Sequence, residues 1–105
     1  MRDYVHVTDL AEAHVAAVAA LEAGAKSGAC NLGSGRGHSV AEVLGAFADA
    51  GVVVPHRYAP RRAGDAARLV ADVSRAREWL GWVPKRSDIG AIVRSALAWH
   101  RRRNA

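Results

Sequence analysis

Three glycines between residues 33 and 37 could form a loop that holds the phosphates of a nucleotide. A dinucleotide-binding loop needs a third glycine five residues after the first, where this chain has His38, and a Walker loop needs a Gly-Lys pair that is absent. The acidic residue that should follow a second strand is Asp49, which lies inside an expected helix. We therefore predict a tight turn that leads into a helix cap at Ser39.

A second candidate for chemistry is residues 61–65, where two arginines are followed by a glycine and an aspartate. A planar guanidinium such as that of Arg62 can bind a diphosphate through two parallel charge-assisted hydrogen bonds. The carboxylate of Asp65 can accept from ribose hydroxyls or orient the arginine. The alternative is that Arg62 and Asp65 form an ion pair that stabilises a surface turn.

Other reactive groups give little support for a site. The five histidines and one cysteine do not show the spacing of a metal site, so no metal is predicted. Cys30 has no partner for an internal disulfide and is interpreted as a small core residue.

Composition and charge limit the class of protein. The 105 residues are enough for one domain; half are hydrophobic and 24% are charged. There is neither a secretory signal nor a membrane-spanning run, so we expect a cytoplasmic protein without a membrane partner. Residues 1–56 carry three Lys/Arg and six Asp/Glu, whereas residues 57–105 carry twelve and four. The basic second half favours an anionic partner or, alternatively, is a solvated arginine-rich surface.

The hydrophobic pattern predicts strands that alternate with helices. Asp9 and Ser39 each precede a glutamate by three residues, which is typical of a helix N-terminus. We expect short strands at 4–7, 29–32, 52–58 and 69–71. Helices are expected at about 9–23, 39–50, 72–80 and 88–100, with Asp72 and either Ser87 or Asp88 as the caps of the last two.

The first expected helix is apolar on nearly every side, which is typical of a helix covered on more than one face. Leaving about four of its larger side chains exposed would forfeit roughly 6–12 kcal/mol. That loss rivals the whole net stability of a domain, about 5–15 kcal/mol. The helix therefore needs a partner, either in an obligate oligomer or in a larger protein.

Four stretches, taken together and in order, point to one enzyme family. They are RDYVHVTDLAEAH at 2–14, NLGSGRGHSVAEV at 31–43, APRRAGDAARLVADVSRAREWLGWVP at 59–84 and WH at 99–100. With them the chain resembles the C-terminal part of the UDP-glucose 4-epimerases (UDP-galactose 4-epimerases). These isomerases of galactose and nucleotide-sugar metabolism are extended short-chain dehydrogenases/reductases of the NAD-dependent epimerase/dehydratase family.

The resemblance implies an α/β fold with short strands and about four helices. Enzymes of this family have an N-terminal Rossmann domain that binds NAD and a smaller C-terminal region that binds the UDP-sugar. Residues 1–105 would form that C-terminal region. Within it, residues 1–36 would pack on or complete the Rossmann domain, and residues 37–105 would form the small substrate domain. The Rossmann core is absent from this sequence, so no NAD is expected to bind to this chain alone.

The resemblance also assigns substrate contacts. Arg2, in the Arg-Asp-Tyr motif, and Arg62 and Asp65, in the Arg-Arg-x-Gly-Asp motif, would contact UDP-glucose or UDP-galactose. Leu69 stands where some relatives carry a tyrosine near the sugar, which leaves the preferred hexose open.

The family's catalytic Tyr-x-x-x-Lys pair is missing, because Tyr4 and Tyr58 are followed four residues later by Thr8 and Arg62. We therefore expect a truncated or split epimerase that is not catalytic alone and whose partner is an N-terminal Rossmann half or a second copy. Two alternatives stay open. One is another NAD-dependent nucleotide-sugar epimerase or dehydratase, and the other is a free-standing basic module that binds polyanions. The stretch GDAARLVAD has no purpose in a simple nucleic-acid binder, so we expect no nucleic-acid partner.

Overall fold

The computed structural model describes residues 1–104, and these contain four helices and one two-stranded sheet. In chain order the elements are β1 (Arg2–Asp3), α1 (Val7–Glu22), β2 (Gly37–His38), α2 (Val40–Asp49), α3 (Ser74–Leu80) and α4 (Ile89–Arg103). The predicted α/β class, with four helices and short strands, is confirmed. None of the four helices combines the length and the apolar character needed to cross a bilayer.

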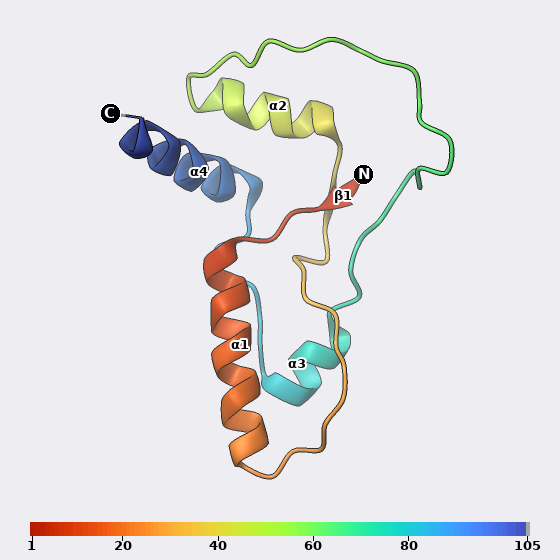
Figure 1. Ribbon diagram of the computed structural model, residues 1–105, viewed down its shortest axis with the longest axis vertical. Coiled ribbons are helices and arrows are strands. Elements are labelled where there is room, and N and C mark those ends of the chain that lie inside the picture. The colour runs from red at the N-terminus through yellow and green to blue at the C-terminus, as the bar shows by residue number, and fades with distance from the viewer. Residues whose placement is uncertain (105) are drawn as a thin grey trace.

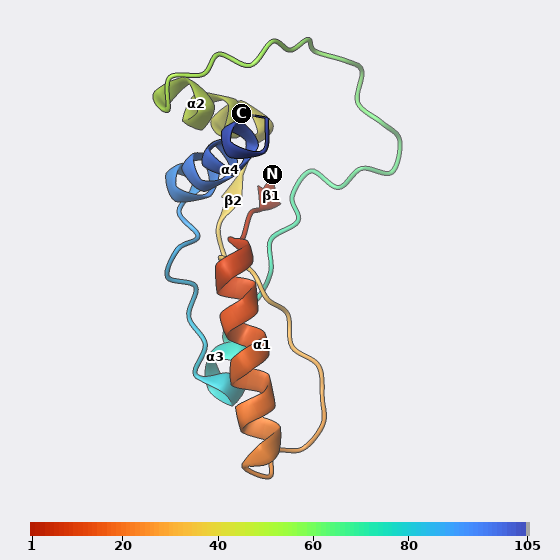
Figure 2. The same cartoon turned by 60° about the vertical axis from the view of Figure 1, so that its left-hand side comes forward.

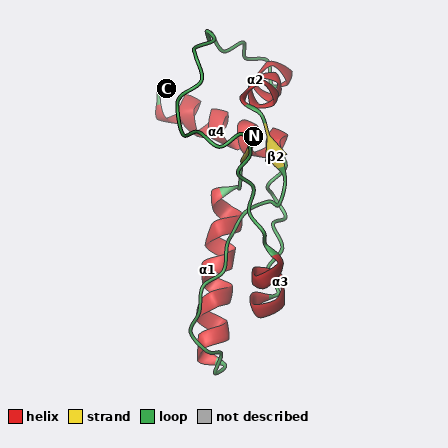
Figure 3. Ribbon diagram, turned by 90° about the vertical axis from the view of Figure 1, so that its right-hand side faces the viewer, coloured by secondary structure: helices red, strands yellow, loops and turns green. Residues whose placement is uncertain are grey.

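The helices pack as two pairs at opposite ends of the molecule (Figures 1 and 2). Helix α3 lies against α1, and α2 lies against α4. Between the pairs, β1 and β2 run antiparallel, with Arg2 opposite His38 and Asp3 opposite Gly37. Arg2 also forms a parallel bridge to Leu69. Residues 51–68 form a long loop that arches away from the helices (Figures 1 and 3).

Most of the predicted helix ends are confirmed. Ser39 caps α2, because its hydroxyl accepts from the backbone N–H of Glu42 at 3.1 Å. Asp88 caps α4 by accepting from the N–H of Ala91 at 2.9 Å. Gly81 ends α3 with a left-handed φ of 63°. These signals act over three or four residues, so the local sequence is enough to read them.

The predicted start of the first helix is wrong, and so is the strand expected at 4–7. Helix α1 begins at Val7 and is capped by the His6 ring, whose Nδ1 accepts from the N–H of Thr8 at 3.0 Å. Asp9 does not cap the helix. Its carboxylate is fully buried and accepts from the N–H of Arg86 at 2.8 Å and from the hydroxyl of Ser87 at 2.5 Å. The carboxylate of Asp9, which the local pattern predicts as the helix cap, accepts instead from Arg86 and Ser87, nearly 80 residues away.

The strands expected at 29–32, 52–58 and 69–71 do not form within residues 1–104, apart from the single bridge at Leu69. A strand exists only where a neighbour pairs with its backbone, and the described part of the chain gives these segments no such neighbour. Asp72 lies one residue before Val73, the N-cap of α3, although its carboxylate accepts from the N–H of Ser74 at 3.0 Å.

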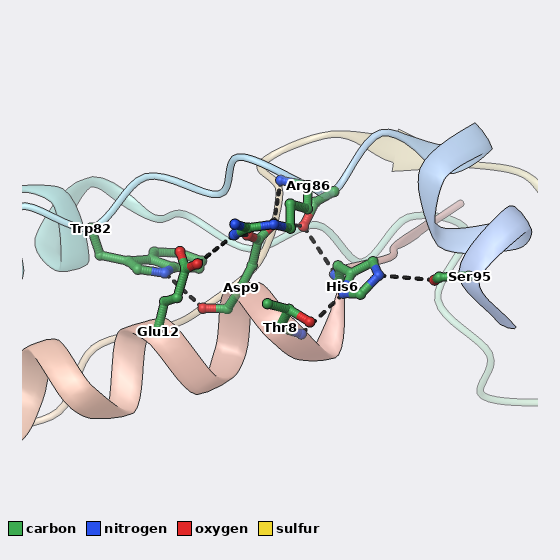
Figure 4. A network of polar contacts seen from close by, with 8 residues as sticks. His6, Thr8, Asp9, Glu12, Trp82, Arg86 and Ser95 are labelled. Carbon is green, nitrogen blue, oxygen red and sulfur yellow. Dashed lines mark hydrogen bonds and ion pairs between the residues drawn. The ribbon is translucent and has the colours of Figure 1, made fainter. Parts of the chain in front are cut away.

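A polar network around Asp9 joins α1 to the segment that leads into α4 (Figure 4). The indole N–H of Trp82 donates to the carbonyl of Asp9 at 2.8 Å, and the Arg86 guanidinium pairs with Glu12. At the start of α1, Nε2 of His6 lies 2.9 Å from the hydroxyl of Ser95 in α4. The network therefore links α1 both to the segment before α4 and, through His6, to α4 itself.

The charge state of Asp9 follows from this network. Burial acts to raise the pKa of Asp9, but hydrogen bonds from Ser87 and Arg86 and the charge of Arg86 outweigh it and hold the pKa below its usual value. The carboxylate is therefore ionised at neutral pH, as a buried acceptor of several hydrogen bonds should be.

Helix α1 is left largely uncovered, as its sequence predicts. Its larger side chains Val7, Val15, Val18 and Leu21 are each more than half exposed. The radius of gyration is 16.5 Å, against about 13 Å for a compact chain of this length. The accessible surface is 7891 Å², against about 5,700 Å² for a globular protein of this mass. The described chain therefore exposes far more surface than a self-contained domain.

Replacing Asp9 by alanine should lower the free energy of unfolding by about 3 kcal/mol, because Ser87 and the Arg86 N–H would lose a buried charged acceptor. The matched control is Glu12→Ala, which removes the exposed partner of Arg86 and should cost less than about 1 kcal/mol. Urea unfolding followed by circular dichroism measures both. Equal losses in the two variants would contradict the central role of Asp9.

Candidate functional site

An open groove of about 530 Å³ lies beside β1 and β2, at the N-terminus of α2. Three of the four residues predicted to contact a nucleotide-sugar line it, namely Arg2, Arg62 and Asp65. The remaining lining residues are Met1, His38, Val40, Arg61, Ala66 and Ala67. The groove thus combines three arginines, one carboxylate and one histidine from segments far apart in the sequence.

Arg2 is held at the floor of the groove by backbone carbonyls. Its Nη1 donates to the carbonyls of Met1 and Ala66, both at 2.9 Å. The adjacent backbone is fastened to the same segment, because the Met1 amine donates to the carbonyl of Ala67 at 2.6 Å and the N–H of Leu69 donates to Met1 at 2.9 Å. These bonds bring the first residues of the chain beside residues 66–69.

The Arg62–Asp65 pair sits on a turn at the rim of the groove. Gly64 has a φ of 81°, which a side chain disfavours, and the N–H of Asp65 donates to the carbonyl of Arg62 at 3.3 Å. Nε of Arg62 lies 3.2 Å from Oδ2 of Asp65, and the Arg62 side chain is 85% exposed. Because only Nε is engaged within residues 1–104, the Nη atoms have no protein partner there.

The fourth predicted contact, Leu69, is not in the groove lining. Its backbone lies beside Arg2, but its side chain is more than half exposed outside the groove. Arg61 and His38 line the groove without having been singled out as site residues. For His38 no local signal exists, because only its pairing with Arg2 brings it to this site.

The glycine-rich loop does bind an anion, but the anion is the chain's own Asp3 carboxylate. Oδ1 accepts from the N–H and the hydroxyl of Ser34, both at 2.7 Å. Oδ2 accepts from the N–H groups of Gly35 at 2.9 Å and Ala71 at 3.2 Å. The turn predicted here is confirmed, and Gly35 takes a φ of 77°. With these N–H groups engaged, the loop does not fit the pyrophosphate of a dinucleotide.

Asp3 stays ionised because of these bonds. Burial acts to raise the pKa of Asp3, but the hydrogen bonds from Ser34, Gly35 and Ala71 outweigh it and hold the pKa below its usual value. Asp3 thereby fastens β1 to the glycine loop and to the segment before α3. It positions Arg2, its neighbour in the chain, without facing the groove lining itself.

Metal chemistry finds no support in the described part of the chain. Within residues 1–104, no three His, Cys, Asp or Glu side chains gather as a metal-binding group. The three arginines of the groove have the chemistry to recognise an anionic ligand.

Several known proteins with a similar sequence or fold are UDP-glucose 4-epimerases. The chain is 51% identical over 102 residues to UDP-glucose 4-epimerase from Azospirillum brasilense, an alignment that covers 96% of this chain and 29% of that protein. The structure of UDP-glucose 4-epimerase from Stenotrophomonas maltophila, with bound NAD and formylated UDP-arabinopyranose, matches 97% of this chain and 30% of its own with a TM-score of 0.90 and 44% identity.

A third match is UDP-glucose 4-epimerase from Bifidobacterium longum in complex with NAD+ and UDP, with a TM-score of 0.83 and 41% identity over 95% of this chain. No family model matches the chain. The chain spans about 30% of the length of these relatives, in their C-terminal part.

Gly33 and Gly45 provide a matched pair of glycine-to-alanine substitutions. A Cβ on Gly33 would lie 2.6 Å from Oδ2 of Asp3 and 2.7 Å from Cβ of Ala71, whereas a Cβ on Gly45 in α2 meets nothing within 4 Å. Gly33→Ala should lower the free energy of unfolding by about 1–3 kcal/mol through overpacking. Gly45→Ala should raise it by about 0.5–1 kcal/mol through helix propensity. Chemical denaturation measures both, and a stable Gly33→Ala variant would contradict the close approach of Asp3.

Acid should weaken the contribution of Asp3 to stability. Its pKa is lower in the folded chain than the unfolded value of about 3.9, so the stabilisation is fully present above that value and is lost as the pH falls through the folded pKa. The difference in unfolding free energy between the wild type and Asp3→Asn should therefore shrink as the pH is lowered from about 6 to about 2. Urea unfolding at each pH measures this difference. A constant difference would show that the charge on Asp3 does not contribute.

Proposed function

This chain is homologous to the C-terminal part of UDP-glucose 4-epimerases, and we propose that it supplies the UDP-sugar-binding surface of such an enzyme. The observation that carries the proposal is the groove, which brings Arg2 together with Arg62 and Asp65 although some 60 residues separate them. Arginines from distant segments that share one groove form a positively charged surface, which supports an anionic ligand as its occupant.

The proposed roles follow from the geometry and the chemistry of each group. Arg2 and Arg62 bind the diphosphate of UDP-glucose or UDP-galactose, Arg62 through its unpaired Nη atoms. Asp65 orients Arg62 through their 3.2 Å contact and can accept from ribose hydroxyls. Leu69 does not line the groove, so its expected influence on the preferred hexose has no geometric support here. The epimerase from Bifidobacterium longum, whose structure contains UDP, is a relative in which such binding occurs.

We further propose that this chain needs another polypeptide segment for catalysis. Relatives of known structure contain NAD. This sequence has no Tyr-x-x-x-Lys pair, and its glycine loop binds Asp3 instead of a cofactor phosphate. Hydride transfer therefore depends on groups that residues 1–104 do not supply. We assign the cytoplasm as the place of action, as expected from the sequence.

The uncovered face of α1 is the proposed contact with that missing segment. Val15, Val18 and Leu21 are exposed, and an apolar groove between α1 and α3 lined by Leu21, Trp79 and Leu80 continues this face. Covering it would bury the apolar area whose exposure is costly. A second copy of the chain is the alternative partner for this face.

Binding of UDP tests the proposed function. Calorimetric titration of the full chain with UDP should show one site, and Arg62→Ala should weaken binding by about tenfold or more, because a charged hydrogen-bonding partner of the diphosphate is lost. Arg62→Lys should recover only part of the affinity, since an ammonium group cannot form the two parallel bonds. Arg102→Ala, at the exposed end of α4, is the matched control and should bind as the wild type does.

The competing idea of a polyanion-binding module gives a different result. In that case the chain would not bind UDP. It would bind duplex DNA with an affinity that falls steeply between about 50 and 200 mM salt. Arg62→Ala and Arg102→Ala would then have similar, modest effects.

A further inference from the structure

His38 occupies a position in the groove that no other group duplicates. It stands directly opposite Arg2 in the β1–β2 pair, and residues opposite each other project from the same face of a sheet. The preceding Gly37 holds β2 tightly in place, because a Cβ there would lie 2.9 Å from Cγ2 of Val70 and 3.4 Å from Cβ of Met1. The backbone of His38 is therefore held beside Arg2, and the residue is among those that line the groove.

The two ring nitrogens of His38 differ in their surroundings. Nδ1 is buried and has no hydrogen-bond partner in residues 1–104. Nε2 of His38 is not among the buried unpaired side-chain atoms, and it makes no hydrogen bond within residues 1–104. It is therefore the accessible nitrogen of a side chain that lines the groove.

The position of the ring proton follows from this difference. A buried N–H without an acceptor is rarer and more costly than a buried bare acceptor. The neutral ring therefore carries its proton on Nε2, and Nδ1 is the bare nitrogen. This tautomer leaves one N–H donor on the accessible nitrogen of a residue that lines the groove, whose charged side chains are three arginines and Asp65.

We propose that His38 is a further ligand-binding residue of this groove, whose Nε2–H donates to a phosphate oxygen of the nucleotide. The proposal rests on the proposed function, because it takes a phosphate-bearing ligand as the occupant of the groove. Phosphate is favoured over a sugar hydroxyl because Arg2, Arg61 and Arg62 surround the same space and the N-terminus of α2 adds its positive end.

Three substitutions at His38 test the donor and its place on the ring. His38→Phe keeps a ring but removes both nitrogens and should weaken UDP binding by about tenfold, the usual value of a hydrogen bond to a charged acceptor. His38→Gln places its amide N–H₂ near the position of Nε2 and should restore most of the affinity. His38→Asn places its amide near Nδ1 and should not. His14→Gln, exposed on α1, is the matched control.

Two further readouts separate ligand contact from a structural role. Inorganic pyrophosphate, which lacks the base and the ribose, should lose affinity in His38→Phe by the same factor as UDP. Ring ¹⁵N–¹H correlation spectra of the wild-type chain should show a protonated Nε2 and a bare Nδ1. Urea unfolding of each variant identifies any loss of affinity that comes from loss of the fold.

The outcomes distinguish this inference from the proposed function. If the wild-type chain binds UDP and folded His38→Phe binds it equally well, the role of His38 is overturned and the proposed function stands. Rescue by asparagine instead of glutamine, or a proton on Nδ1, also overturns it. If the wild-type chain binds neither UDP nor pyrophosphate, the proposed function fails as well.

Discussion

The carboxylate of Asp3 is the contact on which the rest of the molecule depends. It accepts from Ser34, Gly35 and Ala71, and so ties together three segments that are distant in the sequence. Only with these segments together can β1 pair with β2 and Arg2 lie beside His38. A glycine at position 33 is required by the same contact, since any side chain there would displace the carboxylate. The groove is a consequence of this one half-buried carboxylate.

Polar contacts hold this chain together because its apolar core is very small. The buried hydrophobic residues are Ala13, Ala76, Trp82 and Val93 within the described chain, and the two helix pairs share few of them. Asp9 has a part similar to that of Asp3 at the other end of the junction, where its buried carboxylate accepts through Oδ2 from Arg86 and Ser87 of a remote segment. Such contacts specify geometry more than they add stability. Polar contacts thus define the geometry of the chain, and burial of its exposed apolar surface would add to the free energy of unfolding.

Local and long-range features of this chain were not equally predictable from its sequence. The caps at Ser39 and Asp88 were predictable because each involves a residue three positions away. The strand at 52–58 was predicted from β-branched residues, but strands need partners that local sequence does not reveal. Asp9 matched a capping pattern but does not cap α1, because its carboxylate accepts from Arg86 and Ser87 instead. For the groove, the motifs identified Arg62, whereas His38 depended on a pairing that only the fold provides.

The two halves of the proposed site differ in how well they are held, and this difference bears on affinity. Arg2 is fixed by carbonyls, and β2 is packed against Val70 and Met1. The Arg62–Asp65 turn, by contrast, lies in a long loop in which Val53 and Tyr58 are at least 85% exposed. Few contacts within this chain oppose the loop's conformational entropy, so a ligand must provide the free energy to order it. Any surface that packs against this loop would remove that cost and strengthen binding without touching the ligand. Under the proposed function, the affinity of the groove for its ligand is thereby coupled to whatever surface packs against this loop.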